Sequence, residues 1–275
     1  MTVIAMTREM GSLGKDVAAG LADALGINVV HHELVEHHVA ERMQVGESAV
    51  HRFLEGRSSL WERWQIDADR MSRYTADEVL QLAAKGNVLI RGWGAAQLLQ
   101  EIPHVMCVRI CAPMPKRIAE MKQRLDIADT AVVRREIERS DDAHSRTVER
   151  QFGSDWRNAE NYDISLNTGC ISVKLCIDQL QDLARSGDYD ETETSMTVLA
   201  DKSLEASVRQ LLDAQAPDTP FGSGLNVSVS HGEVTIDGVV SETRNLGDVT
   251  ERVAALEGVK RVDNKVYAIT MRSGV

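Results

Sequence analysis

The chain has 275 residues, of which 43% are hydrophobic, so it is long enough for one large domain or two smaller ones. Its net charge of -11 argues against a general affinity for nucleic acid or anionic membrane surfaces, because both require clustered basic residues. No apolar run approaches the length that spans a bilayer, and no secretory signal pattern precedes the first apolar run, so we expect a protein that is not transmembrane. The four cysteines show no paired CxxC spacing and are expected to be reduced thiols, which favours a cytoplasmic location.

Apolar strand-like runs alternate with amphipathic helical stretches through the first two-thirds of the chain. Strands are predicted at 3–7, 28–30, 88–91, 105–112 and 162–166. This alternation predicts an α/β fold, with a parallel sheet covered by helices on both faces. The charged segment 33–85 is helical in pattern, and we expect it to lie over the carboxyl ends of the strands, where open α/β sheets bind ligands.

The first predicted strand runs into REMGSLGKDVA, a loop with two glycines and a lysine that leads into a helix. Backbone amides of such a loop turn inward, Lys15 would reach terminal phosphates, and the helix would direct its positive end at them. The predicted nucleotide-binding residues are Gly11, Ser12, Leu13, Gly14, Lys15 and Asp16. Glu9 and Asp16 stand where the usual pattern has a glycine and a Ser or Thr, so a plain strand-loop-helix turn stays open as the alternative. Without that hydroxyl, Mg²⁺ would depend on waters or on other carboxylates.

A second candidate site is the predicted helix IERSDDAHSRTVERQF. Arg139 and Arg146 are two helical turns apart, so both guanidinium groups project from one face and could grip phosphate together. Phosphoryl transfer needs such arginines to neutralise the charge spread over the transferred group. The alternative is an ordinary solvated, charged helix.

Histidine and tryptophan clusters offer weaker candidates. HHELVEHHVAERM misses the HExxH zinc spacing because Glu36 stands where the second histidine would be, so we predict no metal site. Trp61 and Trp64 are at helical spacing, which favours packing. Trp93 follows the end of a predicted strand that faces the proposed site, where it could stack on a base.

Together these segments carry a resemblance over residues 1–185, which are similar to the cytidylate-kinase-like family within the P-loop nucleoside monophosphate kinases. In that family the lid helix carries an arginine, an acid four residues on and a second arginine, and here these positions hold Arg139, Ala143 and Arg146. The resemblance implies catalytic roles for Lys15 and both arginines, while Asp142 stands beside the lost acid. It also implies contact with the monophosphate from Arg91, Gly92 and Trp93, although the family's Gly-Arg-Asp reads Gly92-Trp93-Gly94 here and Arg91 is displaced by two positions.

The pattern changes after SGDYDETETSM, an acidic run at 186–196 that is typical of a linker. A helix at 204–212, a hairpin in LNVSVSHGEVTIDG, a helix at 245–256 and a strand at 259–269 follow. This second part, 197–272, resembles a BON domain on LNVSVSHGEVTIDGVV and LEGVKRVDNKV. Gly232 is expected in the hairpin turn, Gly238 at the end of the second strand and Gly258 before the last one.

The resemblance implies transfer of the terminal phosphate of ATP to CMP, dCMP or a related acceptor, with Mg²⁺ as the accompanying ion. The missing loop hydroxyl, the missing acid and the altered Gly-Trp-Gly favour another interpretation, a non-catalytic nucleotide-binding regulator. In either case the BON-like domain implies contact with a phospholipid or a protein partner, and not with nucleic acid.

Overall fold

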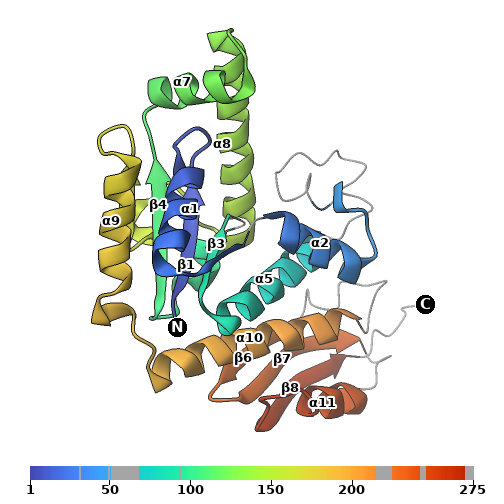
Figure 1. The fold of residues 1–275 in the computed structure, drawn as a ribbon. Helices are drawn as coiled ribbons and strands as arrows, with labels where there is room; N and C mark the ends of the chain where they lie inside the picture. The colour runs from blue at the N-terminus through green and yellow to red at the C-terminus, as the bar shows by residue number, and fades with distance from the viewer. Residues whose placement is uncertain are drawn as a thin grey trace, which may run out of the picture. The chain divides into compact units, whose positions relative to one another are not determined.

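The computed structural model describes residues 1–30, 32–48, 50, 68–92, 94–214, 225–241 and 246–269. Contacts within the chain divide it into two units, Met1–Thr192 and Glu193–Val275, whose helices and strands are drawn in Figure 1. Each unit has its own hydrophobic core. No helix in these described segments combines the length and apolar character that crossing a membrane requires.

A five-stranded parallel sheet forms the centre of the first unit. Its strands are β1 (Val3–Arg8), β2 (Asn28–Val30), β3 (Val88–Arg91), β4 (Val105–Cys111) and β5 (Ile164–Asn167). They lie in the order β2-β3-β1-β4-β5, and the register pairs Val3 of β1 with Val88 and Val105. Because the strands are parallel, all their carboxyl ends meet at one edge, and the loop after β1 begins there. The predicted parallel α/β fold is confirmed.

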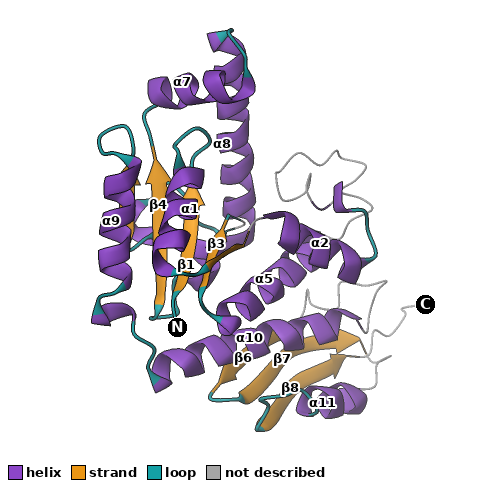
Figure 2. Cartoon of the chain, in the orientation of Figure 1, coloured by secondary structure: helices purple, strands orange, loops and turns teal. Residues whose placement is uncertain are grey.

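Helices cover both faces of this sheet (Figure 2). α1 (Gly14–Leu25) and α9 (Val173–Ala184) pack on one face, where Ile4 and Met6 of β1 meet Leu21 and Leu180 in the core. α6 (Ala95–Leu99) covers the opposite face, where its Ala96 carbonyl accepts a hydrogen bond from the Cys107 thiol. Successive side chains of β1 and β4 point to opposite faces of the sheet, so each of these strands packs against helices on both sides.

Further helices of the first unit include α2 (His32–Met43), α5 (Ala68–Lys85), α7 (Met114–Leu125) and α8 (Thr130–Phe152). α2 packs on α5, and α7 packs on α8 through a small apolar cluster of Ile118, Met121, Val133 and Ile137. Asp129 begins α8 as its N-cap, since its carboxylate accepts the amides of Ala131 and Val132. Of the predicted helical insertion, α2 and α5 are present and residues 51–67 lie outside the described segments.

The second unit is a small α+β domain. Its elements are α10 (Glu193–Ala214), β6 (Leu225–Ser230), β7 (Glu233–Ser241), α11 (Leu246–Ala254) and β8 (Arg261–Ile269). β6 and β7 form an antiparallel hairpin, and β8 pairs with β7 in parallel. His231 and Gly232 both have positive φ, as the predicted two-residue turn requires. The expectation that Gly238 ends a strand is wrong, because Gly238 lies inside β7.

Two predicted boundaries also differ from the structure. Segment 186–196 is not an irregular linker, because a 3-10 turn occupies Gly187–Tyr189 and α10 already begins at Glu193. Tyr189, within this segment, packs against the core of the first unit. Glu193 lies in the first turn of α10, where an acidic side chain is favourable, so part of the acidic run belongs to the start of a helix. The strand predicted at 162–166 begins at Ile164, because the Tyr162 amide bonds to Ala159 and closes a turn.

Because each unit has its own core, fragments 1–192 and 193–275 should each fold alone. We expect both fragments to show a cooperative thermal transition by circular dichroism. A fragment that melts without cooperativity would contradict this division of the chain.

Candidate phosphate site

The loop between β1 and α1 has the backbone of a phosphate-binding turn. Gly11 and Leu13 both lie in the left-handed region, with φ of 77° and 58°. The amide and the hydroxyl of Ser12 donate to the Glu9 carbonyl, at 3.2 and 2.8 Å, which closes the loop. Leu13 is the N-cap of α1 and provides no side-chain cap, and within the described chain the amides of residues 13–15 donate to no other group. These amides are the unsatisfied donors that an anion at a helix start accepts.

A pocket of about 450 Å³ opens beside this loop, between α1 and α7. It is lined by Arg8, Gly11, Leu13, Gly14, Lys15, Asp16, Glu120, Met121, Gln123 and Arg124. All the predicted nucleotide-binding residues except Ser12 line it, whereas Ser12 is fully buried. A Cβ atom on Gly11 would lie 2.7 Å from the Arg117 carbonyl, so this glycine lets the loop pack directly on α7.

Positive side chains gather at this pocket. Arg8, Lys15 and Arg124 line it from the end of β1, the start of α1 and the last turn of α7. The pKa of Arg8 is lowered to about 10, first by burial and then by the neighbouring charges of Arg91 and Arg124, while Asp16 acts in the opposite direction. Like charges held this close repel one another, and a bound anion would relieve that repulsion. Neither Arg8 nor Arg124 is singled out by the sequence.

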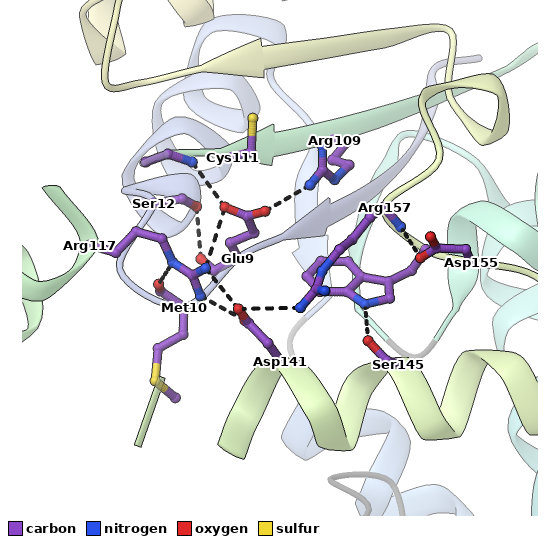
Figure 3. A network of polar contacts seen from close by, with 12 residues as sticks. Glu9, Met10, Ser12, Arg109, Cys111, Arg117, Asp141, Ser145, Asp155 and Arg157 are labelled. Atoms are coloured by element: carbon purple, nitrogen blue, oxygen red, sulfur yellow. Dashed lines mark hydrogen bonds and ion pairs between the residues drawn. The ribbon is translucent and has the colours of Figure 1, made fainter. Parts of the chain in front are cut away.

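Glu9, which stands where a glycine is usual, has a structural role (Figure 3). Its carboxylate is buried, accepts a hydrogen bond from Arg109 Nη2 at 2.7 Å and accepts the Ala112 amide at 3.0 Å. Glu9 therefore ties the loop to the end of β4. A side chain is accommodated at this position because its carboxylate is buried among these partners, and Glu9 is not among the residues that line the pocket.

The network extends from Glu9 to helix α8 through Arg117. The Arg117 guanidinium donates to both carboxylate oxygens of Asp141, at 2.7 and 2.8 Å, and to the Met10 carbonyl at 2.7 Å. Arg157 lies 3.6 Å from the same aspartate. Of the two adjacent aspartates, Asp141 is therefore the one buried in this network, while Asp142 is exposed.

The two predicted lid arginines lie elsewhere on α8. Arg139 and Arg146 are exposed, and neither lines the pocket. At about 100° of rotation per residue, they lie about 160° and 140° around the helix from Asp141. They share one face, as predicted, but this face is turned away from the contact with α7. Their catalytic role remains a prediction.

The predicted monophosphate contacts lie at the end of β3. Arg91 is buried there and close enough to Arg8 to lower its pKa. Gly92 has φ of 95° and donates its amide to the Met6 carbonyl of β1. This places the turn after β3 at the same edge of the sheet as the phosphate loop. Trp93, like Trp61 and Trp64, lies outside the described segments.

The histidine-rich helix α2 forms hydrogen bonds with acidic neighbours. His38 Nδ1 lies 2.7 Å from the buried Glu78 carboxylate of α5, and His37 Nδ1 lies 2.6 Å from the Glu47 carboxylate. Arg42 donates to Asp77, which is fully buried. No group of three or more His, Cys, Asp or Glu side chains in the described segments could hold a metal ion. These contacts account for the described part of the cluster as helix packing.

His144 of α8 should make stability depend on pH. Its ring packs on Trp156, with centroids 4.4 Å apart, and burial lowers the pKa of His144 to about 4. Between pH 6.5 and pH 4 the unfolded chain therefore binds a proton that the folded chain does not. Stability is fully present above pH 6.5, and the free energy of unfolding should fall by up to about 3 kcal/mol as the pH drops toward 4.

Urea unfolding at pH 7 and pH 4.5 checks this expectation. His144→Phe keeps an aromatic ring against Trp156 and removes the titrating group, so its loss of stability between the two pH values should be smaller than that of the wild type. An equal loss in both proteins would show that other groups control the acid transition.

The parallel sheet with a phosphate-type turn between β1 and α1 defines the P-loop class of kinase-like α/β proteins. Within that class, the model of the cytidylate kinase-like family matches residues 3–169, and the chain belongs to this family. Residues 200–268 match the model of the BON domain. Both resemblances inferred from the sequence are confirmed.

One solved structure shares the fold of the first unit at low sequence identity. An uncharacterized protein from Eubacterium ventriosum is 19% identical, with a TM-score of 0.54 over 68% of this chain and 99% of that one. Shikimate kinase from Acinetobacter baumannii, in complex with shikimate, is 13% identical over 66% of this chain and 92% of that one, with a TM-score of 0.38. Shikimate kinase from Bacteroides thetaiotaomicron is also 13% identical, over 67% and 99%, with a TM-score of 0.41. Comparison with curated proteins gives no match.

Proposed function

We propose that the first unit binds ATP at the 11–15 loop and transfers its terminal phosphate to a nucleoside monophosphate, with CMP or dCMP as the preferred acceptor. The observation that carries the proposal is the pocket where Arg8, Lys15 and Arg124 meet the unsatisfied amides at the start of α1. Amides and cations fixed in one place neutralise phosphate charge, and phosphoryl transfer depends mainly on that neutralisation and on positioning.

Magnesium fits this site only as an ion carried by the nucleotide. Asp16 and Glu120 are the acidic side chains among the lining residues. Mg²⁺ keeps several waters and is usually bound through one or two carboxylates together with substrate phosphates. Asp16 would hold such an ion in place of the usual hydroxyl, and the ion would add positive charge beside the phosphates.

The acceptor would bind at the edge of the sheet where β3 ends. Arg91 and Gly92 lie at this edge, and Trp93 follows them in sequence. With Arg91 close to Arg8, the acceptor phosphate would lie beside the donor phosphates. Asp142, exposed on α8, would contact the acceptor only when that helix lies over the site.

A non-catalytic nucleotide-binding regulator is the second candidate. Exposure of Arg139 and Arg146, away from the pocket, favours it, as does the missing hydroxyl at Asp16. A regulator must act on another molecule, and the BON domain would do so by contacting a phospholipid or a protein partner. Val239 and Tyr267 support such a contact, because they are paired on neighbouring strands and are 49% and 72% exposed. The free thiols of all four cysteines accord with the proposed cytoplasmic location.

Measuring ADP formation from ATP and Mg²⁺ with CMP, dCMP, UMP, AMP and GMP in turn tests the proposal. We expect turnover with a cytidine monophosphate above that with the purine nucleotides. A protein that binds ATP in calorimetry and turns over no acceptor would be the regulator. A protein that binds no nucleotide would contradict both candidates.

A further inference from the structure

Arg117 links its own helix to two parts of the first unit that lie far away in sequence, the phosphate loop and α8 (Figure 3). It lies in the first turn of α7 and is 4% exposed. Nε donates to the Met10 carbonyl in the phosphate loop, Nη1 lies 3.6 Å from the Glu9 carboxylate, and both Nη atoms donate to Asp141 of α8. One guanidinium group therefore joins the loop, α7 and α8.

The local sequence places Arg117 at this junction. Ile118 and Met121 on α7 pack against Val133 and Ile137 of α8, so the two helices form an apolar contact. Asp141 lies one turn beyond Ile137 on the same face of α8, which brings its carboxylate to the end of that contact. Arg117, next to Ile118, meets Asp141 there.

The buried part of the network is balanced in charge, and the half-exposed Arg157 adds a third guanidinium group beside Asp141. Two carboxylates, Glu9 and Asp141, face two guanidinium groups, Arg109 and Arg117, and all four side chains are at most 12% exposed. Apolar residues of similar volume often stabilise a protein as well as a buried ion pair does, so stability alone gives no reason for this arrangement. What a planar, forked guanidinium adds is geometry, because it fixes several acceptors in one orientation.

We propose that Arg117 is a positioning residue that links the conformation of the phosphate loop to the position of helix α8. This inference rests on the proposed phosphate site, since the loop it positions is the one that would hold ATP. A displacement of α8 that carries Asp141 away leaves Arg117 charged and buried with fewer acceptors. The hydrogen bond from Arg117 to the Met10 carbonyl then changes, and the orientation of the backbone amides of residues 13–15 changes with it. Because coupling is reciprocal, a phosphate that fixes the loop also favours the α8 position in which Asp141 meets Arg117.

Hydrogen exchange in the ligand-free protein measures this link directly. Ser12, Asp16 and Val17 donate amide hydrogen bonds that close the loop and start α1. Asp141→Asn keeps the side-chain shape and removes the charge that holds Arg117, so exchange at these three amides should accelerate. The matched control is Glu138→Gln on the same helix, which removes an exposed ion pair with Arg134 and should leave the loop unchanged.

Calorimetry with ATP and Mg²⁺ separates positioning from simple structural support. At a temperature where both variants are fully folded, Asp141→Asn should weaken ATP binding about tenfold, the effect of one charge-assisted hydrogen bond, and Glu138→Gln should not. Arg117→Lys keeps the charge but cannot reach Met10 and both Asp141 oxygens together. The two substitutions combined should therefore weaken binding no more than Arg117→Lys alone.

Loop exchange that is the same in Asp141→Asn and Glu138→Gln would overturn the inference. So would an acceleration spread evenly over the chain, because that pattern indicates general destabilisation. A wild type that binds no ATP would contradict the proposed function. Hydrogen exchange at the loop amides would still decide whether the position of α8 controls the conformation of the loop. If Arg117→Lys does not fold, Asp141→Asn alone gives both readouts.

Discussion

Lys15→Ala should weaken ATP binding about 10- to 100-fold, the loss that follows removal of a hydrogen bond to a charged group. Lys15 lines the pocket at the second residue of α1, beside Arg8 and Arg124, where its ammonium group would meet the terminal phosphates. The substitution removes an exposed side chain, so the fold should be retained. Isothermal calorimetry with ATP and Mg²⁺ measures the effect.

Lys174→Ala is the matched control for this experiment. Lys174 lies on α9, pairs with Asp178 and is 83% exposed, so its loss changes net charge equally without touching the pocket. Binding should be unaltered in this variant. Equal affinities in Lys15→Ala and the wild type would remove the loop from the nucleotide site.

Arg139→Ala and Arg146→Ala should each lower turnover by a factor of ~100 or more, the usual cost of losing one group that stabilises charge in the transition state. Contacts made to the transferred group strengthen as charge develops, so affinity for ATP should change much less. Both arginines are exposed and lie outside the pocket, so the lid role requires α8 to leave, during turnover, the position in which Asp141 meets Arg117. Steady-state turnover and ATP affinity, measured side by side, test this expectation.

Arg134→Ala provides the control, because Arg134 lies on the same helix and its ion pair with Glu138 is exposed. Turnover that none of the three substitutions alters would defeat the lid role. A wild type without turnover would leave the arginines with no catalytic function and would favour the regulator.

The order of elements in the first unit could be predicted because it depends on local patterns. Apolar runs bounded by polar residues located all five strands, and the glycine-rich turn after β1 located the loop. The ends of strands and helices were predicted less accurately where a tertiary contact decides them. Tyr162 reads as part of a strand, but its hydroxyl donates to the Trp156 carbonyl and its backbone closes a turn. Likewise, the acidic run before α10 resembles a linker because charged residues are common in both linkers and first helical turns.

Much of the candidate site could not be predicted, because it depends on contacts between distant segments. Arg117 and Met10 are 107 residues apart, and Arg109 and Glu9 are 100 apart, so no local spacing indicates either pair. One signal was available: Asp141 falls on the apolar face of α8, four residues after the buried Ile137. A charged residue within an apolar face needs a buried partner, and this points to an arginine elsewhere in the chain.

Glu9 has a consequence for how this loop can change during evolution. A single Glu9→Gly substitution would restore the usual glycine, but it would leave the Arg109 and Arg117 guanidinium groups facing a void and the Ala112 amide without its acceptor. Removing one partner of a buried ion pair typically costs about 3–5 kcal/mol, so intermediates on that path would be strongly destabilised. The unusual loop is therefore entrenched, and a return to the common pattern would require several substitutions together.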